Sequence, residues 1–96
     1  MIVSFGDKLT EALYHGGKAK DLRKFLPDLR RTAEGKLDML NAARMLTDLR
    51  SPPANHLEAL KADLKGFYSI RVNDQWRIVF KWQGSDALDV RVTDYH

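Results

Sequence analysis

The strongest constraint on the fold is an alternation of apolar and polar side chains that runs through residues 67–93. Because successive side chains of a β-strand point to opposite faces of a sheet, this period predicts strands that each bury one face. The C-terminal part of the chain is therefore expected to form an antiparallel β-meander with helices on one face only. The expected inward side chains are those of Tyr68, Ile70, Val72, Trp76, Ile78, Phe80, Trp82, Leu88, Val90 and Val92.

The same alternation predicts the loops of the meander, because residues opposite one another in an antiparallel pair lie on the same face. Between the first two strands, a three-residue loop over 73–75 keeps like faces together, whereas a two-residue turn mixes them. Between the last two strands, the same argument favours a five-residue loop over 83–87. The cross-strand pairs expected from these loops are Val72–Trp76, Ile70–Ile78, Phe80–Val90, Lys81–Asp89 and Arg77–Thr93.

The N-terminal part of the chain predicts a strand and two helices. Residues 2–5 are expected to form the strand, and Asp7 is expected to cap a short helix over 8–15. A longer helix is expected to begin near Pro27 and must end before Ser51-Pro52-Pro53, because proline disfavours helix in the residue before it. Its apolar stripe comprises Leu29, Ala33, Leu37 and Leu40, widened by Met39, Ala42, Ala43, Leu46 and Leu49.

Composition fits one small globular domain, which we expect to span residues 1–96. Of the 96 residues, 44% are hydrophobic and 30% are charged, and no apolar run approaches the length that crosses a bilayer. We therefore expect no membrane partner. The chain has no cysteine, which excludes a thiolate nucleophile and a cysteine-based zinc site, and a cytoplasmic location fits this composition best. The predicted architecture is α+β, with the N-terminal strand and both helices packed on one face of a mainly antiparallel sheet.

The helix-free face of the predicted sheet is strongly cationic. Four basic side chains share its parity, with Asp89 as the one acidic residue of the strands on that face, and Phe67 has the same parity. Arginine and lysine hold phosphates and phenylalanine stacks bases, so this face is a candidate RNA surface. A simply solvated sheet face is the competing interpretation. The candidate RNA-binding residues are Lys65, Phe67, Arg71, Lys81 and Arg91.

Chemistry is expected where the last strand meets Asp94-Tyr95-His96, with which the sequence ends. Cleaving RNA without a metal needs a base for the 2′-hydroxyl, a cation for the phosphoryl oxygens and an acid for the leaving 5′-oxygen. His96 belongs to the residue type whose unperturbed pKa lies near neutrality, and Tyr95 can donate a proton. Asp94 could orient an imidazole. A terminal histidine is more often frayed and idle, which is the competing interpretation.

Two basic residues are the candidates for stabilising phosphate charge. Arg77 is permanently cationic and can bind phosphate through two nitrogens. Lys61 lies on the connector before Gly66 and could approach the same end of the sheet as the terminal residues. Because Tyr95 shares the parity of Arg77 while Asp94 and His96 do not, we expect the last residues to bend out of the ladder toward Arg77 and Lys61.

No metal or cofactor is expected. His56 and Glu58 have an HxE spacing, but no third or fourth ligand joins them in the pattern. The sequence has no glycine-rich phosphate loop, GxSxG elbow or HExxH motif.

Residues 48–61 and 66–78 closely resemble the HigB-type toxins of bacterial toxin–antitoxin systems, within the RelE superfamily. The stretch SIRVNDQWR (residues 69–77) and the final DYH carry most of this resemblance, which covers essentially the whole chain. It implies a small ribonuclease-like α+β fold and an endonuclease that cuts mRNA in the ribosomal A site. It also implies 2′,3′-cyclic phosphate and 5′-hydroxyl ends, formed without metal.

The resemblance further implies partners and site residues. The usual partner is a helix-turn-helix antitoxin of the HigA type, through which alone the toxin meets operator DNA. Asp94, Tyr95 and His96 match the C-terminal catalytic residues of the family, Lys61 matches its connector lysine and Arg77 matches the arginine after its motif tryptophan.

Three positions depart from the family pattern. Glu58 stands where some relatives carry a histidine, and His56 stands where an arginine is common, so both are auxiliary candidates. Ala62 replaces a common glycine. Two other functions stay open: inhibition of gyrase by a toxin of the same superfamily, and binding of RNA or ribosomes without catalysis.

Overall fold

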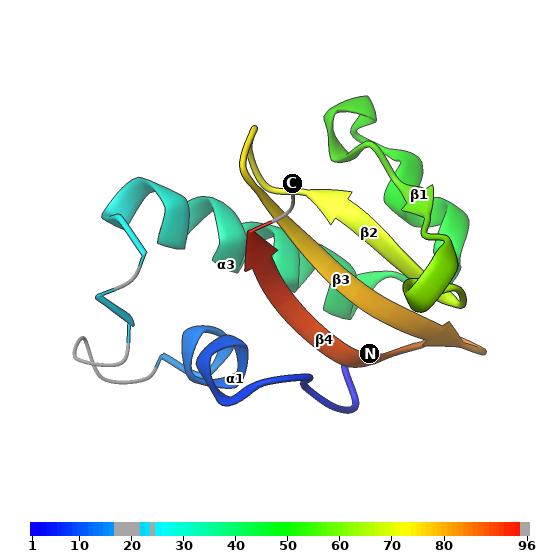
Figure 1. Cartoon of the computed structure of the whole chain (residues 1–96), viewed down its shortest axis with the longest axis horizontal. Coiled ribbons are helices and arrows are strands. Elements are labelled where there is room, and N and C mark those ends of the chain that lie inside the picture. The colour runs from blue at the N-terminus through cyan, green and yellow to red at the C-terminus, as the bar shows by residue number, and fades with distance from the viewer. Residues whose placement is uncertain (17–21, 24, 95–96) are drawn as a thin grey trace.

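Helices and sheet form two layers in the computed structural model, which describes residues 1–16, 22–23 and 25–94. Within those residues, α3 crosses behind the strands and α1 lies beside β4 (Figure 1). The strands form one antiparallel sheet in the order β1-β2-β3-β4, which confirms the predicted α+β class. The elements are α1 (Lys8–Tyr14), α3 (Pro27–Ala42), the 3₁₀ turns η1 (Leu46–Arg50) and η2 (Pro53–Asn55), β1 (Glu58–Ala59), η3 (Ala62–Leu64), β2 (Phe67–Arg71), β3 (Trp76–Gln83) and β4 (Asp86–Asp94).

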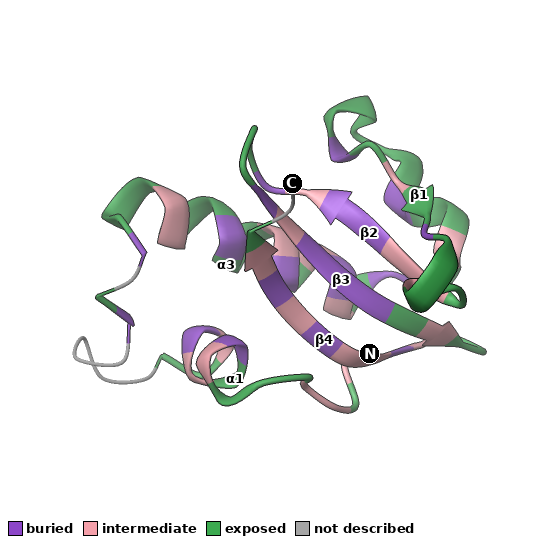
Figure 2. Ribbon diagram, in the orientation of Figure 1, coloured by how far each residue is buried: buried purple, intermediate pink, exposed green. Residues whose placement is uncertain are grey.

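The core fills the space between the helices and the inward face of the sheet (Figure 2). Most of it is built by the side chains that the two periodicities place inward, since helical spacing gathers one stripe and strand spacing one face. The patterns did not predict three further members of the core, Leu22, Phe25 and Ala87. The fully buried large side chains of this cluster are Leu13, Leu22, Leu37, Leu40, Leu49, Ile70, Ile78, Phe80 and Val90.

Both predicted helices form, but the longer one is shorter than predicted. Asp7 caps α1 by accepting a hydrogen bond of 2.8 Å from the amide of Thr10. α3 ends at Ala42, and the expectation that the helical stripe continues to Leu49 is wrong. The carboxylate of Asp48 accepts from the amides of Arg44 and Met45, each at 3.0 Å, and so starts the separate turn η1.

The hydrogen bonds that Asp48 accepts also change the pKa of its carboxyl group. Hydrogen bonds from the amides of Met45 and Arg44 lower the pKa of the Asp48 carboxyl, because they stabilise its ionised form. Leu49 is nevertheless fully buried in the core. The apolar spacing therefore predicts Leu49 as an inward residue correctly, although the chain reaches it by a turn rather than by one helix. It is wrong for Ala42, which is exposed at the end of α3.

The loop between β2 and β3 is the predicted three-residue loop. Arg71 pairs with Arg77 and Ile70 with Ile78, and the amide of Val72 donates to Trp76 O at 2.9 Å. Arg77 also pairs with Thr93 of β4, as predicted.

The five-residue loop predicted between β3 and β4 is wrong. Gln83 pairs with Asp86, which leaves a two-residue turn, and a bulge interrupts the register between Val79 and Lys81. On β4 the bulge includes Asp89, whose φ of 51° is left-handed. The shorter turn would move the side chains of β4 to the opposite faces of the sheet. The extra residue of the bulge returns those that follow it to the predicted faces.

The bulge changes which side chains face the core. Leu88, predicted to face inward, pairs with Lys81 on the helix-free side, and Ala87 is buried in its place. The predicted cross-strand pairing of Lys81 with Asp89 is therefore wrong, although the two side chains still form an ion pair of 3.6 Å across the bulge.

The N-terminal segment lies beside β4 but forms isolated bridges rather than the predicted regular strand. Ile2 bridges Ala87 and Phe5 bridges Val90, both in parallel orientation. The contact is close, because a Cβ at Gly6 would lie 2.8 Å from Asp89 O. Glycine at this position therefore allows the segment to reach the bulge.

Candidate nucleic-acid interface

The helix-free side of the sheet gathers the predicted basic side chains. We call Phe67, Arg71, Arg77, Lys81 and Arg91 the cationic face. Strand pairing sets their order, because Phe67 lies opposite Lys81, Arg71 opposite Arg77, and Val79 opposite Arg91. The centre of this face is not solvated, since Ser69 is 0% and Val79 1% exposed.

The cationic face has more acidic neighbours than the sequence predicted. The prediction counted Asp89 alone among the residues of the strands. Arg71 also pairs with Asp74 of the β2–β3 loop, and Glu58 enters from the edge strand β1. The face therefore carries excess positive charge that is partly paired, and a polyanion that binds there must compete with carboxylates.

Phe67 lies between two of the cations. Lys81 Nζ lies 5.0 Å from the centroid of its ring and Arg91 Cζ lies 5.7 Å from it. These are cation–π distances, so the ring holds both charges near one point of the face. Phe67 is half-buried. Cations beside an aromatic ring that keeps part of its surface accessible suit single-stranded RNA, because they bind phosphates next to a stacking surface.

Arg77 is the most strongly held cation of the face. Its side chain is only 13% exposed. Its Nε donates to Ser69 Oγ at 2.8 Å and its Nη2 donates to the backbone carbonyl of His56 at 2.7 Å. The same Nη2 lies 3.2 Å from Glu58 Oε1. The guanidinium is therefore oriented by its surroundings before any ligand arrives.

The loop that supplies the His56 carbonyl is anchored in the protein interior. His56 has a left-handed backbone with φ 44°, and its neighbour Asn55 is 0% exposed. The Asn55 side-chain amide donates to Leu49 O at 3.1 Å, and its oxygen accepts from Lys36 Nζ of α3. His56 itself is exposed, so its contact with Arg77 is made by its backbone and not by its imidazole.

The two connector lysines lie at the other end of β2. Lys61 precedes η3 and follows Leu60, whose amide donates to Phe67 O at 2.9 Å. The backbone of Lys61 is therefore beside the start of β2, and the expectation that it lies at the end of the sheet where β4 ends is wrong for its backbone. Lys65 is exposed at the end of η3, close in sequence to Phe67.

Asp94 ends β4 in the ladder, opposite Trp76. It is exposed, and Gln75 Nε2 donates to its Oδ2 at 2.8 Å. The strand is thus still paired at Asp94, one residue beyond the Arg77–Thr93 pair. Tyr95 and His96, and the predicted bend of the chain at these residues, lie outside the described residues.

The structure thus brings together part of the predicted site. Arg77, Glu58 and the backbone of His56 are in contact, and Asp94 ends the neighbouring strand. Sequence reasoning missed Ser69, which touches Arg77 from β2. The alternation does place this serine on the helix-free face, among charged residues. It does not predict which side chain the serine hydroxyl binds.

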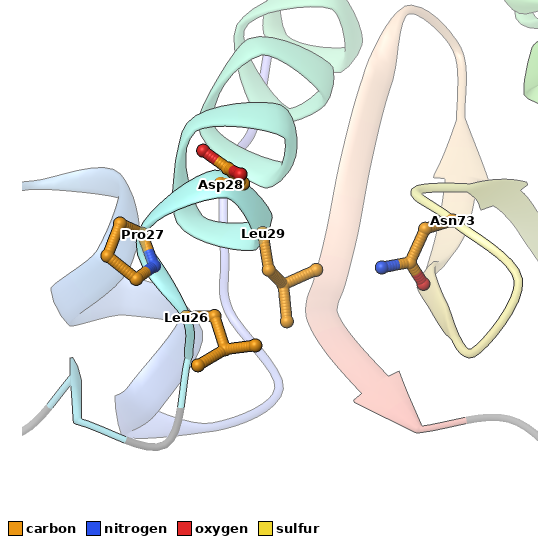
Figure 3. Close-up of a pocket in the computed structure, with 5 residues that line it drawn as sticks. All are labelled: Leu26, Pro27, Asp28, Leu29 and Asn73. Atoms are coloured by element: carbon orange, nitrogen blue, oxygen red, sulfur yellow. The ribbon is translucent and has the colours of Figure 1, made fainter.

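Among the described residues, no group of three or more His, Cys, Asp or Glu side chains could hold a metal ion. No helix in this part of the chain is long and apolar enough to cross a membrane. A pocket of about 510 Å³ opens at the start of α3, where Leu26 and Leu29 face Asn73 of the β2–β3 loop (Figure 3).

Solved structures share this fold at low sequence identity. The chain matches a YoeB–YefM complex from Staphylococcus aureus with a TM-score of 0.63 and 17% identity, covering 100% of this chain and 98% of the other. It matches YafQ from E. coli with a TM-score of 0.54 and 14% identity, covering 98% and 91%. These likenesses establish a shared architecture.

Sequence comparison is more specific. The model of the family described as "RelE-like toxin of type II toxin-antitoxin system HigB" matches residues 3–96. The protein named toxin HigB-1 from Vibrio cholerae is 39% identical over 90 residues, which are 93% of this chain and 92% of that protein. A protein named endoribonuclease HigB from Proteus vulgaris is 42% identical over 40 residues, 42% of this chain and 44% of that protein. Because the family match and the first of these relatives both span nearly all of it, the chain belongs to the HigB family of RelE-like toxins of type II toxin–antitoxin systems.

Proposed function

We propose that this toxin is an endoribonuclease that cleaves mRNA in the ribosomal A site during translation and so inhibits protein synthesis. The observation that carries the proposal is the oriented guanidinium of Arg77 on a cationic sheet face. A fixed, nearly buried cation is suited to stabilise charge that develops on a phosphoryl group, because it needs little reorganisation during the reaction. The name of the Proteus relative, endoribonuclease HigB, supports the same activity.

The proposed reaction is an internal transesterification. The 2′-oxygen attacks the adjacent phosphorus and the bond from phosphorus to the 5′-oxygen breaks, which leaves a 2′,3′-cyclic phosphate and a 5′-hydroxyl. A base takes the 2′ proton and an acid returns a proton to the 5′-oxygen. We assign the acid–base work to His96 and Tyr95, with Asp94 orienting the imidazole. The proton balance closes without a metal.

Arg77 and Lys61 are proposed to stabilise the phosphate. Arg77 offers a planar fork that matches phosphoryl oxygens, whereas Lys61 adds a flexible point charge from the far end of β2. Glu58 is in contact with Arg77 at 3.2 Å and therefore competes with the phosphate for the same cation. We accordingly assign Glu58 and His56 auxiliary roles, with Glu58 tuning how readily Arg77 accepts a phosphate.

The remaining cations are proposed to bind the message. Lys81 and Arg91 flank Phe67, Arg71 lies opposite Arg77, and Lys65 ends the turn before β2. Toxins of this family work with an antitoxin partner. We propose a helix-turn-helix antitoxin of the HigA type, through which alone the toxin is brought to operator DNA, and a bacterial cytoplasm as the place of action.

Primer extension on a translated message tests the activity. Purified protein added to an in vitro translation reaction is expected to create new mRNA ends, and a chain lacking His96 is expected to create few or none. Ribosome co-sedimentation without new ends would instead support a binding module. Inhibition of purified gyrase without new ends would support the gyrase alternative.

Replacing Phe67 with alanine is expected to weaken binding to the ribosome–mRNA complex by about 1–3 kcal/mol, the typical cost of losing one stacked base. It also removes the ring that holds Lys81 and Arg91 together. Affinity is measured by sedimentation with programmed ribosomes at fixed salt. Unchanged affinity would remove Phe67 from the proposed RNA surface.

A further inference from the structure

Ser69 is a buried polar residue on a face that the sequence predicted to be open. It is 0% exposed, although it lies on the helix-free side of β2. It pairs with Glu58 of β1 on one side and with Val79 of β3 on the other, so it occupies the middle of the sheet. A buried hydroxyl is costly unless it is hydrogen-bonded. The Ser69 Oγ atom accepts a hydrogen bond from Arg77 Nε at 2.8 Å.

The position of this bond on the guanidinium is informative. Nε is the nitrogen within the side chain, so a fixed acceptor on Nε sets the rotation of the whole planar group. The second neutral acceptor, His56 O, holds Nη2 at 2.7 Å. Two fixed acceptors on different nitrogens determine the plane in which Arg77 presents its charge.

The chemical nature of these acceptors also matters. A hydroxyl and a carbonyl orient the guanidinium without cancelling its positive charge. Glu58 differs, because its carboxylate both contacts Arg77 and lowers the charge that a phosphate would meet. The neutral acceptors therefore orient the Arg77 guanidinium, whereas the Glu58 carboxylate competes with a phosphate for it.

We propose that Ser69 is a positioning residue for Arg77, which holds the guanidinium in the plane that a scissile phosphate requires. This inference rests on the proposed nuclease function. Ser69 is buried, so it does not touch substrate and acts only through Arg77. A serine that merely fills space between β1 and β3 is the alternative, since a small side chain fits a crowded sheet centre.

The positioning role and the space-filling role predict different effects of Ser69→Ala when Arg77 is also replaced. If Ser69 acts through Arg77, Ser69→Ala lowers kcat for ribosomal mRNA cleavage about tenfold in the parent, in line with the loss of one hydrogen bond to a charged group. The same change has no further effect in an Arg77→Ala background, because the group it orients is gone. Ser69→Thr retains the hydroxyl and is expected to restore most of the activity.

Thr93→Val is the matched control. Thr93 lies opposite Arg77 on the same face, and this change also removes one hydroxyl while keeping the size of the side chain. It is expected to leave kcat within about twofold of the parent, because the Ser69 and His56 acceptors that orient Arg77 remain in place. Thermal unfolding of each variant separates lost activity from lost folding.

An NMR measurement keeps this inference distinct from the nuclease proposal. The Nε–H proton of Arg77 is expected to exchange slowly with water in the parent and faster in Ser69→Ala. Slow exchange in an inactive parent would contradict the nuclease function but not the orientation of Arg77. The positioning role is overturned if Ser69→Ala leaves kcat unchanged, if it lowers kcat equally in both backgrounds, or if the Nε–H exchange does not change.

Discussion

Replacing Arg77 with alanine is expected to lower the rate of mRNA cleavage on the ribosome by about 100-fold or more, as removal of one preorganised donor to a developing anion does in other enzymes. The physical reason is the placement of the guanidinium, which is 13% exposed and held by Ser69 and His56. Rates are measured under single-turnover conditions with programmed ribosomes, so that product release does not mask the chemical step.

Two variants control this prediction. Arg31→Ala removes the same charge from the exposed surface of α3, where Arg31 is 83% exposed and pairs only weakly with Asp28 at 3.8 Å. It is expected to cut like the parent. Arg77→Lys keeps the charge but loses the fork and the Nε donor, so it is expected to recover only a minor part of the lost rate. Parental activity in Arg77→Ala would remove Arg77 from the catalytic site.

Replacing Phe80 with alanine is expected to lower the free energy of unfolding by about 3–5 kcal/mol, the usual cost of truncating a fully buried phenylalanine. Phe80 is 0% exposed, and its ring centroid lies 6.2 Å from that of Tyr68 and 6.3 Å from that of Trp82. A loss of that size is a large fraction of the stability of a small domain. Urea denaturation followed by tryptophan fluorescence measures it.

Phe67→Ala is the matched control for Phe80→Ala, because both residues are phenylalanines on paired strands but face opposite sides of the sheet. Phe67 is half-buried on the cationic face, outside the main core. Its loss is expected to cost no more than about 1–2 kcal/mol of stability. Equal losses for the two variants would contradict the assignment of the core to the helix-covered side.

Strand periodicity predicted most of the sheet, because the alternation of side chains is a property of the backbone. It placed Arg77 opposite Thr93 and fixed the length of the β2–β3 loop. It was wrong at the β3–β4 turn because a bulge adds one residue and so restores parity over a shorter loop. The left-handed backbone of Asp89 that makes this bulge leaves no trace in the apolar pattern.

Helix periodicity also predicted only part of the structure. It identified the residues that α3 and η1 bury, but not the break between them. That break depends on a local competition, in which the Asp48 carboxylate accepts from two amides that a continuing helix would have used. An aspartate in an apolar stripe is compatible with both outcomes.

The candidate site was likewise predicted only in part from the sequence. Parity and the family motif identified Arg77, but they could not show that the edge strand β1 brings Glu58 to it. They also could not show that His56 acts through its carbonyl, since this depends on a left-handed backbone and on the buried anchor of Asn55. These contacts arise from tertiary pairing between segments that sequence spacing does not relate.

The most direct test of the central claim compares two messages that differ only in the start codon. Purified protein is added to a translation system with each message, and the new 5′ ends are mapped. We expect ends within codons of the translated message, and none on the message that lacks a start codon. Cleavage of both messages alike, or of neither, would contradict a toxin that cuts mRNA in the ribosomal A site.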